Sequence, residues 1–535
     1  MPEARGFSVL LERILSGRGA FLLSFGFGAV AALAFAPIYL LPLFALGLTG
    51  LLALLERRER PCGGFLIGWS FGFGHFAVGF YWITESFKAH PAMLDALGPP
   101  AVLLLAAGMA IYPGLVGWAH RKMRLSGFAA LFGFATLWAA AEWLRGHLFT
   151  GFPWNPAAAI WTVSTVLMQP LALFGTYGLG AITAFIAASP ALLVSPARPK
   201  RAVFAPLAGL LLIGLGAAGG SLRLASHPTL FVEDMTIRLV QPNIDQREKW
   251  DRDKEREHFA RYLSLSQRLP WPGGHVLLVW PETAITDYFF DREIGRRALI
   301  ARLLPPGAML VTGVPRAVEG PDGRLLPANS VMAVASDGQI AGIYDKRHLV
   351  PFGEYLPARR ILARFGLDAL AAAGEDFIAG ESLMTIAEPG FPAFTPLICY
   401  EIVFPGAVLT EDGARPDLLV NVTNDAWFGN SVGPYQHFAQ ARMRAVEEGL
   451  PIARAAGTGI SGIIDPWGRM VRRIGLQTLG VIDSPLPRAA EKPFLARNRG
   501  LVFPALLVLG CILTALAAYA TDRRNSGPAS TRQAA

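Results

Sequence analysis

Long uncharged stretches fill the first 223 residues of the chain and return once near its end. Residues 19–55, for example, contain no Asp, Glu, Lys or Arg and are divided by Pro37 and Pro42. A helix needs about 20 apolar residues to cross about 30 Å of hydrocarbon. The pattern therefore predicts eight membrane-spanning helices, at residues 20–36, 39–55, 64–84, 99–119, 126–144, 163–194, 203–222 and 501–520.

The pattern changes after residue 236, where short runs rich in Val, Ile and Leu alternate with amphipathic stretches. The runs predict strands at 237–240, 276–280, 309–313, 330–335, 340–344, 395–400, 418–422, 452–455 and 462–464. The amphipathic stretches predict helices at 249–267, 291–304 and 434–448. Strands alternating with helices indicate an α/β domain with covered sheets. The expected organisation is a membrane domain of seven spans, an α/β domain, an eighth span and a tail, at residues 1–223, 224–496, 497–522 and 523–535.

The composition supports a membrane protein. Hydrophobic residues make up 53% of the chain and charged residues 16%, whereas about a quarter of the residues in soluble domains are charged. A purely soluble protein and a disordered chain are therefore excluded. The three cysteines Cys62, Cys399 and Cys511 match neither a disulfide framework nor a zinc pattern. We expect no metal and no cofactor.

The positive charges indicate which side of the membrane each loop occupies. Arg and Lys gather in alternate segments between the predicted spans, and the other short loops hold only Lys88 and Arg145. Cytoplasmic loops carry such an excess of positive charge. With a cytoplasmic N-terminus, seven spans place residues 224–496 outside the cytoplasm, and the eighth returns the C-terminus to it. Because the basic residues are scattered, nucleic-acid binding is not expected.

Three residues at the ends of predicted strands could perform chemistry together. Glu282 follows one strand, Lys346 follows another, and Cys399 lies near the end of a third. A thiol acts as a nucleophile when it is a thiolate, so it needs a base and a positive neighbour. A lysine also stabilises the oxyanion of a tetrahedral intermediate. Taken singly, Cys399 could be a buried hydrophobe, Glu282 a helix cap and Lys346 a solvated strand end, and His348 is an alternative base.

The sequence motifs around these residues resemble those of the apolipoprotein N-acyltransferase family, a membrane-embedded branch of the nitrilase superfamily. The order Glu282, Lys346, Cys399 is similar to the Glu-Lys-Cys triad of that superfamily. The resemblance covers nearly the whole chain and is carried by Trp280-Pro-Glu-Thr-Ala284, Lys346-Arg-His-Leu-Val-Pro-Phe-Gly-Glu-Tyr355, Cys399-Tyr-Glu401, Asn424-Asp-Ala-Trp-Phe-Gly429 and Ala441-Arg-Met-Arg-Ala445. It implies an αββα nitrilase-like sandwich inserted before the last of eight spans.

The resemblance also implies an activity. Such an enzyme transfers an acyl chain from a phospholipid, typically phosphatidylethanolamine, to the N-terminal amine of the diacylglyceryl-cysteine of apolipoproteins. Cys399 would carry the chain as a thioester between two half-reactions. The implied location is the bacterial inner membrane, with the catalytic domain in the periplasm and both termini in the cytoplasm. We expect a monomer.

Five further residues match positions of the family near the triad. Glu354 could hold the ammonium of Lys346, or be a surface carboxylate. Tyr400 and Glu401 could shape the pocket. Trp250 and Trp427 could contact lipid or gate its entry, and core packing is the alternative for both.

Two other classes of protein compete with this interpretation. A membrane-tethered amidase of the nitrilase type would keep the triad and use water as acceptor, but one span would anchor it. A transporter would show internal repeats or paired ion-binding residues within its spans, and the sequence has neither. His75 and Glu142 are ionisable residues within predicted spans, which suggests either a function or a hydrogen bond between helices.

Overall fold

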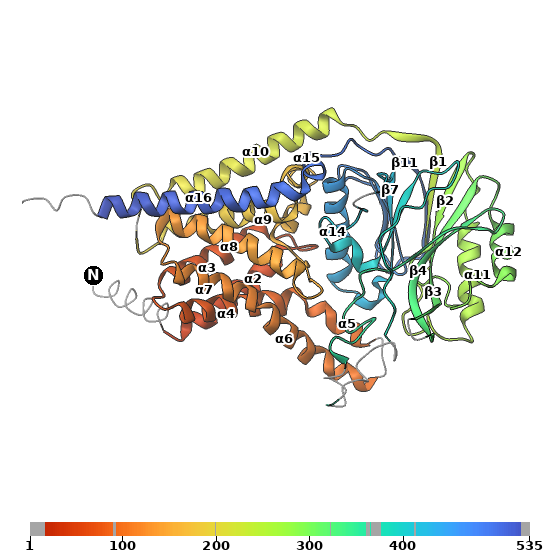
Figure 1. Ribbon diagram of the computed structural model, residues 1–535, viewed down its shortest axis with the longest axis horizontal. Coiled ribbons are helices and arrows are strands. Elements are labelled where there is room, and N and C mark those ends of the chain that lie inside the picture. The colour runs from red at the N-terminus through yellow and green to blue at the C-terminus, as the bar shows by residue number, and fades with distance from the viewer. Residues whose placement is uncertain are drawn as a thin grey trace, which may run out of the picture. The chain divides into compact units, whose positions relative to one another are not determined.

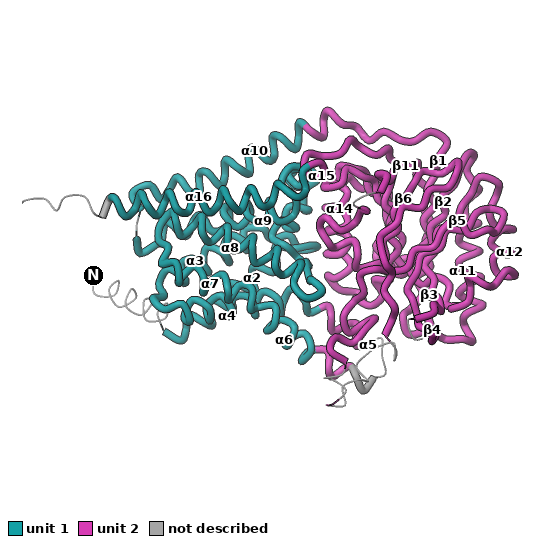
Figure 2. The backbone as a smooth tube through the Cα atoms, in the orientation of Figure 1, with its two compact units in different colours: residues 1–81, 99–222, 498–535 teal, residues 82–98, 223–497 magenta. Residues whose placement is uncertain are grey.

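The computed structural model describes residues 17–88, 92–197, 199–320, 323–359, 364, 376–410 and 413–525. The chain divides into two compact units (Figure 2). Unit 1 comprises residues 1–81, 99–222 and 498–535, and unit 2 comprises residues 82–98 and 223–497. Residues 82–98, which the sequence assigns to the membrane domain, thus belong to unit 2. Residues 526–535 of the expected tail lie outside the described residues.

Unit 1 is built from apolar helices (Figure 1). They are α2 (Gly19–Ala31), α3 (Leu41–Glu56), α4 (Pro61–Gly79), α6 (Gly98–Met109), α7 (Ile111–Lys122), α8 (Gly127–His147), α9 (Leu171–Ala188), α10 (Phe204–Ser226) and α16 (Arg499–Asn525). Each of the eight expected spans overlaps at least one of these helices. The fourth span falls on α6 and α7 in succession.

Length and hydropathy single out fewer than eight helical segments. Within the described residues, five are long and apolar enough to cross a membrane, namely Asp95–Lys122, Gly127–His147, Leu171–Leu193, Phe204–Ser226 and Arg499–Arg523. Gly19–Ala34 and Leu41–Glu56 are apolar but shorter. The number of eight crossings therefore stays a prediction. The sixth expected span, residues 163–194, begins as an α-helix only at Leu171, because Pro170 favours a helix start over a helix interior.

Small residues allow the helices of unit 1 to approach closely. Gly64 of α4 and Gly117 of α7 face each other, and a Cβ on either would collide with the carbonyl oxygen of the other. Close backbone approach through small residues is the usual way in which membrane helices associate.

Polar residues of α8 fix the loop that follows it. Glu142 Oε1 accepts hydrogen bonds from Trp138 Nε1 (3.2 Å) and from the Ala157 amide (2.7 Å). Arg145 Nη1 donates to the carbonyl oxygens of Phe152 (2.7 Å) and Trp154 (2.8 Å). These bonds tie Glu142 Oε1 to its own helix and to the segment that follows, whereas its Oε2 accepts no hydrogen bond from a described residue, and a function for Glu142 stays a prediction.

Unit 2 contains two β-sheets. The six-stranded sheet has the order β11-β1-β2-β3-β4-β5, and the five-stranded sheet has the order β10-β9-β8-β7-β6. β1, β2 and β3 run parallel, as do β6, β7 and β8, and the remaining pairs are antiparallel. The strands are β1 (Phe231–Gln241), β2 (His275–Val279), β3 (Ala308–Glu319), β4 (Leu325–Ala335), β5 (Ile340–Asp345), β6 (Phe394–Ile398), β7 (Leu418–Thr423), β8 (Ile452–Ala456), β9 (Ser461–Ile464), β10 (Met470–Ile474) and β11 (Gly480–Pro487).

The two sheets pack face to face between helices. α11 (Glu255–Ser266) and α12 (Ile294–Leu303) cover the six-stranded sheet, and α14 (Gly433–Glu448) lies beside the five-stranded one (Figure 1). A buried apolar cluster joins α11, α12 and the first sheet, with Trp280, Tyr262 and Ile300 among its members. Strands of the two sheets, such as β4 and β6, contact each other directly. The expected αββα sandwich is therefore present.

Each predicted strand overlaps an observed one, and two observed strands were not predicted. β10 and β11 were missed because their side chains are partly exposed and their sequences, with Arg472, Arg473 and Asp483, do not form apolar runs. The strand expected at 395–400 ends at Ile398, because Cys399 leaves the extended conformation.

Candidate active site

Cys399 lies at a sharp turn between a strand and a helical turn. β6 ends at Ile398, and the short helical turn η8 (Cys399–Val403) begins at once. Cys399 has a φ of 50° and is 7% exposed. A non-glycine residue in the left-handed region costs conformational energy and is typical of active sites. The turn therefore marks Cys399 as a functional candidate independently of any motif.

A continuous hydrogen-bonded chain connects Glu282 with Lys346. Asn329 Nδ2 donates to Glu282 Oε1 (2.7 Å) and to Glu354 Oε1 (2.8 Å). Lys346 Nζ donates to Glu354 Oε1 at 2.9 Å. All these groups are largely buried, and Lys346 is 1% exposed. Glu354 therefore holds the lysine ammonium, which is the arrangement that the sequence suggested.

The two carboxylate oxygens of Glu282 differ in their hydrogen bonds. Glu282 Oε1 is occupied by Asn329, whereas Oε2 is buried and accepts no hydrogen bond from any residue within the described ranges. A buried acceptor without a donor costs free energy. An active site can tolerate this cost when the atom is needed to accept a proton from a substrate or a nucleophile.

The electrostatics keep the thiol protonated and the lysine charged at rest. Burial raises the pKa of Cys399, the charge of Glu282 raises it further, and Lys346 only partly opposes them. Burial by itself would lower the pKa of Lys346, but the charges of Glu354, Glu282 and Cys399 outweigh burial and raise it above its ordinary value. Cys399 is thus a neutral thiol at rest, and the Glu282 carboxylate lies near enough to raise its pKa.

Glu401 joins the ends of two strands. Its Oε1 accepts hydrogen bonds from the Tyr344 hydroxyl (2.6 Å) and from the Arg347 and His348 amides (3.0 and 3.1 Å). Its Oε2 accepts one from the Ile398 amide at 2.7 Å. Because Ile398 precedes Cys399 and Arg347 follows Lys346, this carboxylate fixes the two reactive residues relative to each other.

Two of the remaining predicted residues, Tyr400 and Trp250, contact other aromatic rings. The Tyr400 ring contacts Phe404 and His348, with ring centroids 4.9 and 5.8 Å away. The His348 ring packs on Phe404 at 3.9 Å, so it serves as part of an aromatic group. Trp250 is 45% exposed and stacks on Tyr288, which excludes the core-packing alternative for this residue.

Trp427 lies in a loop that residues 82–88 hold in place. The loop contains the short helical turn η9 (Asp425–Phe428), in which Trp427 is half-buried. Ser86 Oγ donates to the Trp427 carbonyl at 2.9 Å. The Trp82 ring meets Phe428 edge-on at 4.5 Å. The segment that begins after α4 thus completes unit 2 beside the nucleophile-bearing sheet.

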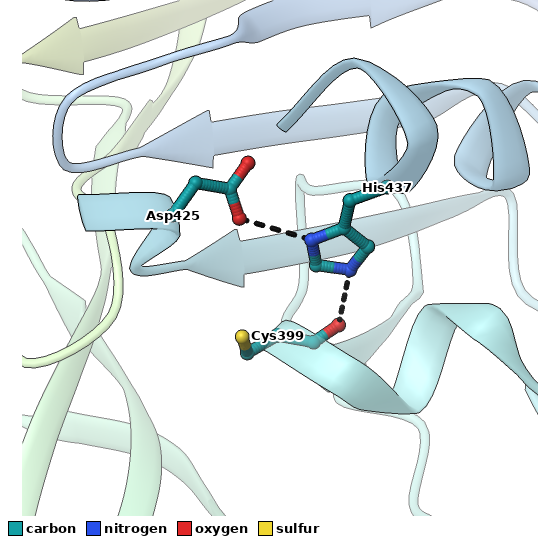
Figure 3. A group of neighbouring side chains, drawn as sticks. All are labelled: Cys399, Asp425 and His437. Atoms are coloured by element: carbon teal, nitrogen blue, oxygen red, sulfur yellow. Dashed lines mark hydrogen bonds and ion pairs between the residues drawn. The ribbon is translucent and has the colours of Figure 1, made fainter. Parts of the chain in front are cut away.

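Behind Cys399 lies a buried charged network that sequence reasoning missed (Figure 3). His437 Nε2 donates to the Cys399 carbonyl oxygen (3.1 Å), and His437 Nδ1 lies 2.9 Å from Asp425 Oδ1. Arg454 Nη2 donates to Asp425 Oδ2 at 2.6 Å. His437 Nε2 faces the Cys399 carbonyl oxygen in Figure 3, so His437 supports the backbone at this turn, and the Cys399 sulfur lies within 4.8 Å of a ring nitrogen of His437.

One feature of the sequence could have revealed this network. Arg454 stands in the middle of an apolar strand, where a charged side chain must have a buried partner. Burial alone would raise the pKa of Asp425, but Arg454 and His437 outweigh it and hold that pKa below its ordinary value. The carboxylate therefore stays charged inside the domain.

Cys399, Asp425 and His437 also carry side-chain types that can bind a metal ion. One ligand atom each from Cys399, Asp425 and His437 lies within 4.8 Å of the others. However, Asp425 already accepts hydrogen bonds from Thr423 and Arg454, and the Arg454 guanidinium would repel a cation. The donor set fits a support for the nucleophile better than a metal centre.

Removing the charge of Arg454 is expected to destabilise unit 2. The Arg454→Met variant leaves Asp425 buried without its main counter-charge, and such a break costs about 3–5 kcal/mol of folding free energy. Thermal unfolding of the detergent-solubilised variant should show a lower midpoint than the natural protein. The double variant Arg454→Met/Asp425→Asn should recover part of the loss, and an unchanged midpoint in the single variant would contradict the role of the ion pair.

Two protein-family models match parts of this chain. Residues 236–493 match the carbon-nitrogen hydrolase family, and residues 27–189 match the apolipoprotein N-acyltransferase N-terminal domain. A solved CN-hydrolase superfamily protein from Xanthomonas campestris is 23% identical, with 51% of this chain and 96% of that chain covered and a TM-score of 0.35.

Two named relatives extend over almost the full length. The apolipoprotein N-acyltransferase of Rhodopseudomonas palustris is 37% identical over 530 residues, which are 95% of this chain and 98% of the relative. That of Bradyrhizobium diazoefficiens is 38% identical over 503 residues, which are 91% and 93% of the two chains. With both of its parts matched and such relatives aligned from end to end, this chain belongs to the apolipoprotein N-acyltransferase family.

Proposed function

We propose that this protein transfers an acyl chain from a phospholipid to the N-terminal amine of the diacylglyceryl-cysteine of apolipoproteins. Phosphatidylethanolamine is the expected donor. The observation that supports the proposal is electrostatic: Glu282 and Lys346 both act on the pKa of the buried Cys399 thiol, and Glu282 Oε2 accepts no hydrogen bond from a described residue. Family membership adds the substrate class, because the relatives are named for it.

The first half-reaction forms a thioester on Cys399. Glu282 Oε2 takes the thiol proton while the sulfur attacks the ester carbonyl of the phospholipid. The Lys346 ammonium, held by Glu354, stabilises the oxyanion of the tetrahedral intermediate. The intermediate collapses with cleavage of the ester C–O bond, and Glu282 returns its proton to the departing oxygen of the lysophospholipid.

The second half-reaction discharges the thioester. The free amine of the apolipoprotein attacks the carbonyl carbon, and Glu282 takes a proton from the nitrogen. Lys346 again stabilises the oxyanion, and the C–S bond then breaks. Cys399 regains a proton from Glu282, and the product is an amide. The carboxylate thus acts as base, acid, base and acid in turn, with no net change in the enzyme.

The membrane topology belongs to the same proposal. We place the N- and C-termini in the cytoplasm and residues 224–496 in the periplasm of a bacterial inner membrane, since the basic residues cluster in alternate loops. Both substrates are lipids that such a membrane presents on its outer face. The enzyme is proposed to act as a monomer, because one chain supplies the three reactive groups.

A two-stage mass measurement tests the function. The purified full-length enzyme is mixed with phosphatidylethanolamine alone, and peptide mapping should place one acyl adduct on Cys399. Cys62 and Cys511, which are exposed, serve as internal controls and should remain unmodified. A diacylated lipopeptide with a free amino terminus should then remove the adduct and gain its mass.

The same lipopeptide with an acetylated amino terminus is the matched control for the acceptor. It should leave the adduct on Cys399 in place. If the adduct disappears at the same rate with water alone, the protein is a hydrolase of the nitrilase type. If no adduct forms on Cys399, the thioester mechanism is wrong.

A further inference from the structure

The active site contains a second lysine that the mechanism above does not use. Lys249 lies in the loop between β1 and α11 and is 7% exposed. Its Nζ donates to the backbone carbonyl oxygen of Glu282 at 2.9 Å. Fully buried lysines are rare unless they are paired. Here the ammonium is bound to the main chain of the residue assigned as the general base.

The loop that carries Lys249 is fixed by its own hydrogen bonds. The amides of Glu248 and Lys249 both donate to the Asp245 carbonyl oxygen, each at 3.1 Å, which closes a tight turn. Arg247 Nε donates to the carbonyl oxygen of Lys88 at 3.1 Å. The turn therefore presents Lys249 inward at a fixed position.

Lys249 and Lys346 interact with some of the same ionisable groups. The negative charge of Glu282 favours the protonated form of each of the two lysines, and so does the Cys399 thiolate once it forms. The counter-ion differs, because Lys346 is paired with Glu354, whereas the hydrogen-bond partner of Lys249 among the described residues is a backbone carbonyl. Burial consequently lowers the pKa of Lys249 to about 8, although Glu282 and Cys399 oppose that shift.

Other charged groups line the same cavity as Lys249. The cavity that its side chain lines is also lined by Glu255 and His258 of α11 and by Arg296 of α12. Glu255 and Arg296 neutralise each other in an ion pair of 2.6 Å. The charge that acts most on Lys249 at rest is thus that of Glu282.

We propose that Lys249 is a positioning residue for acyl transfer, whose ammonium fixes the main chain of Glu282 and adds a second positive charge beside the reacting thiol. This inference rests on the proposed function. In the charged form, Lys249 favours the anionic states of Glu282 and Cys399. In the neutral form, it keeps the hydrogen bond to the Glu282 carbonyl but loses the charge. The Glu282–Cys399 pair should therefore react more slowly as pH rises through the pKa of Lys249.

The test compares acylation rates over a range of pH. Full-length natural enzyme and Lys249→Met are mixed with phosphatidylethanolamine, and the first-order rate of adduct formation on Cys399 is measured from pH 6 to pH 10. At pH 7 the variant should be roughly 10- to 100-fold slower, which is the effect of losing one charged hydrogen bond. The ratio of the two rates should fall above pH 8, because the natural enzyme loses the same charge. A merely structural lysine would give a ratio that is independent of pH.

Two further variants make the result decisive. Lys249→Arg keeps its charge above pH 8, so its rate relative to the natural enzyme should rise with pH even if Lys249→Met folds poorly. Lys254→Met is the matched control, because Lys254 is exposed and pairs with Glu248, and it should acylate at the natural rate. A flat pH ratio for both Lys249 variants would overturn the proposal. Absence of an adduct in the natural enzyme would instead refute the proposed function.

Discussion

Replacing Lys346 with methionine is expected to slow acylation of Cys399 by about 10²–10³-fold, the usual cost of one oxyanion donor. The ammonium is buried, charged and held by Glu354, so no water can replace it at low energetic cost. Its charge is needed most when the ester oxygen becomes negative. The loss should therefore lie in the rate constant for adduct formation and much less in phospholipid binding.

The control for this variant separates catalysis from folding. Removing Lys346 leaves Glu354 with the Asn329 and Val350 donors only, so the double variant Lys346→Met/Glu354→Gln relieves the unpaired charge. Both variants should acylate slowly, and the double variant should unfold at a higher temperature than the single one. Recovery of the natural rate in the double variant would show that Lys346 acts only by neutralising Glu354.

Replacing Glu282 with glutamine is expected to slow both half-reactions by about 10²–10⁴-fold, the range for general acid–base catalysis. A glutamine keeps the size of the side chain and can still accept the Asn329 hydrogen bond, but it cannot take a proton. The pKa of Cys399 is raised by burial, by Glu282 and by Asp425, so few thiolates exist at neutral pH. Residual acylation of the variant should rise steeply with pH, because hydroxide must then remove the thiol proton.

A surface carboxylate provides the matched control. Glu257, which pairs with Arg261 on the exposed side of α11, should tolerate the change to glutamine with a natural rate and pH dependence. Rapid adduct formation by Glu282→Gln at pH 7 would exclude Glu282 as the base. The network of His437 and Asp425 would then have to be considered, although His437 binds a carbonyl oxygen.

Local patterns predicted much of this fold because they report local physics. The uncharged runs and the short Val/Ile/Leu runs each correspond to a described helix or strand, as in the run 340–344 and β5. Strands such as β10 were not predicted because an edge strand with two adjacent Arg residues contains no apolar run. The place of residues 82–98 in unit 2 was not predicted for a different reason. It depends on contacts between distant parts of the chain, such as the one between Trp82 and Phe428.

The sequence by itself determined the apolar segments and the α/β domain, and its motifs led us to propose Glu282, Lys346 and Cys399 as the reactive residues, because each inference depends on residue type and spacing along the chain. Only the tertiary structure decided which groups surround them. Asn329 between two carboxylates, Lys249 on the Glu282 carbonyl and Arg454 against Asp425 lie 25–47 positions from a partner. Their roles arise from burial, since a charge removed from water must find a partner wherever the fold places one.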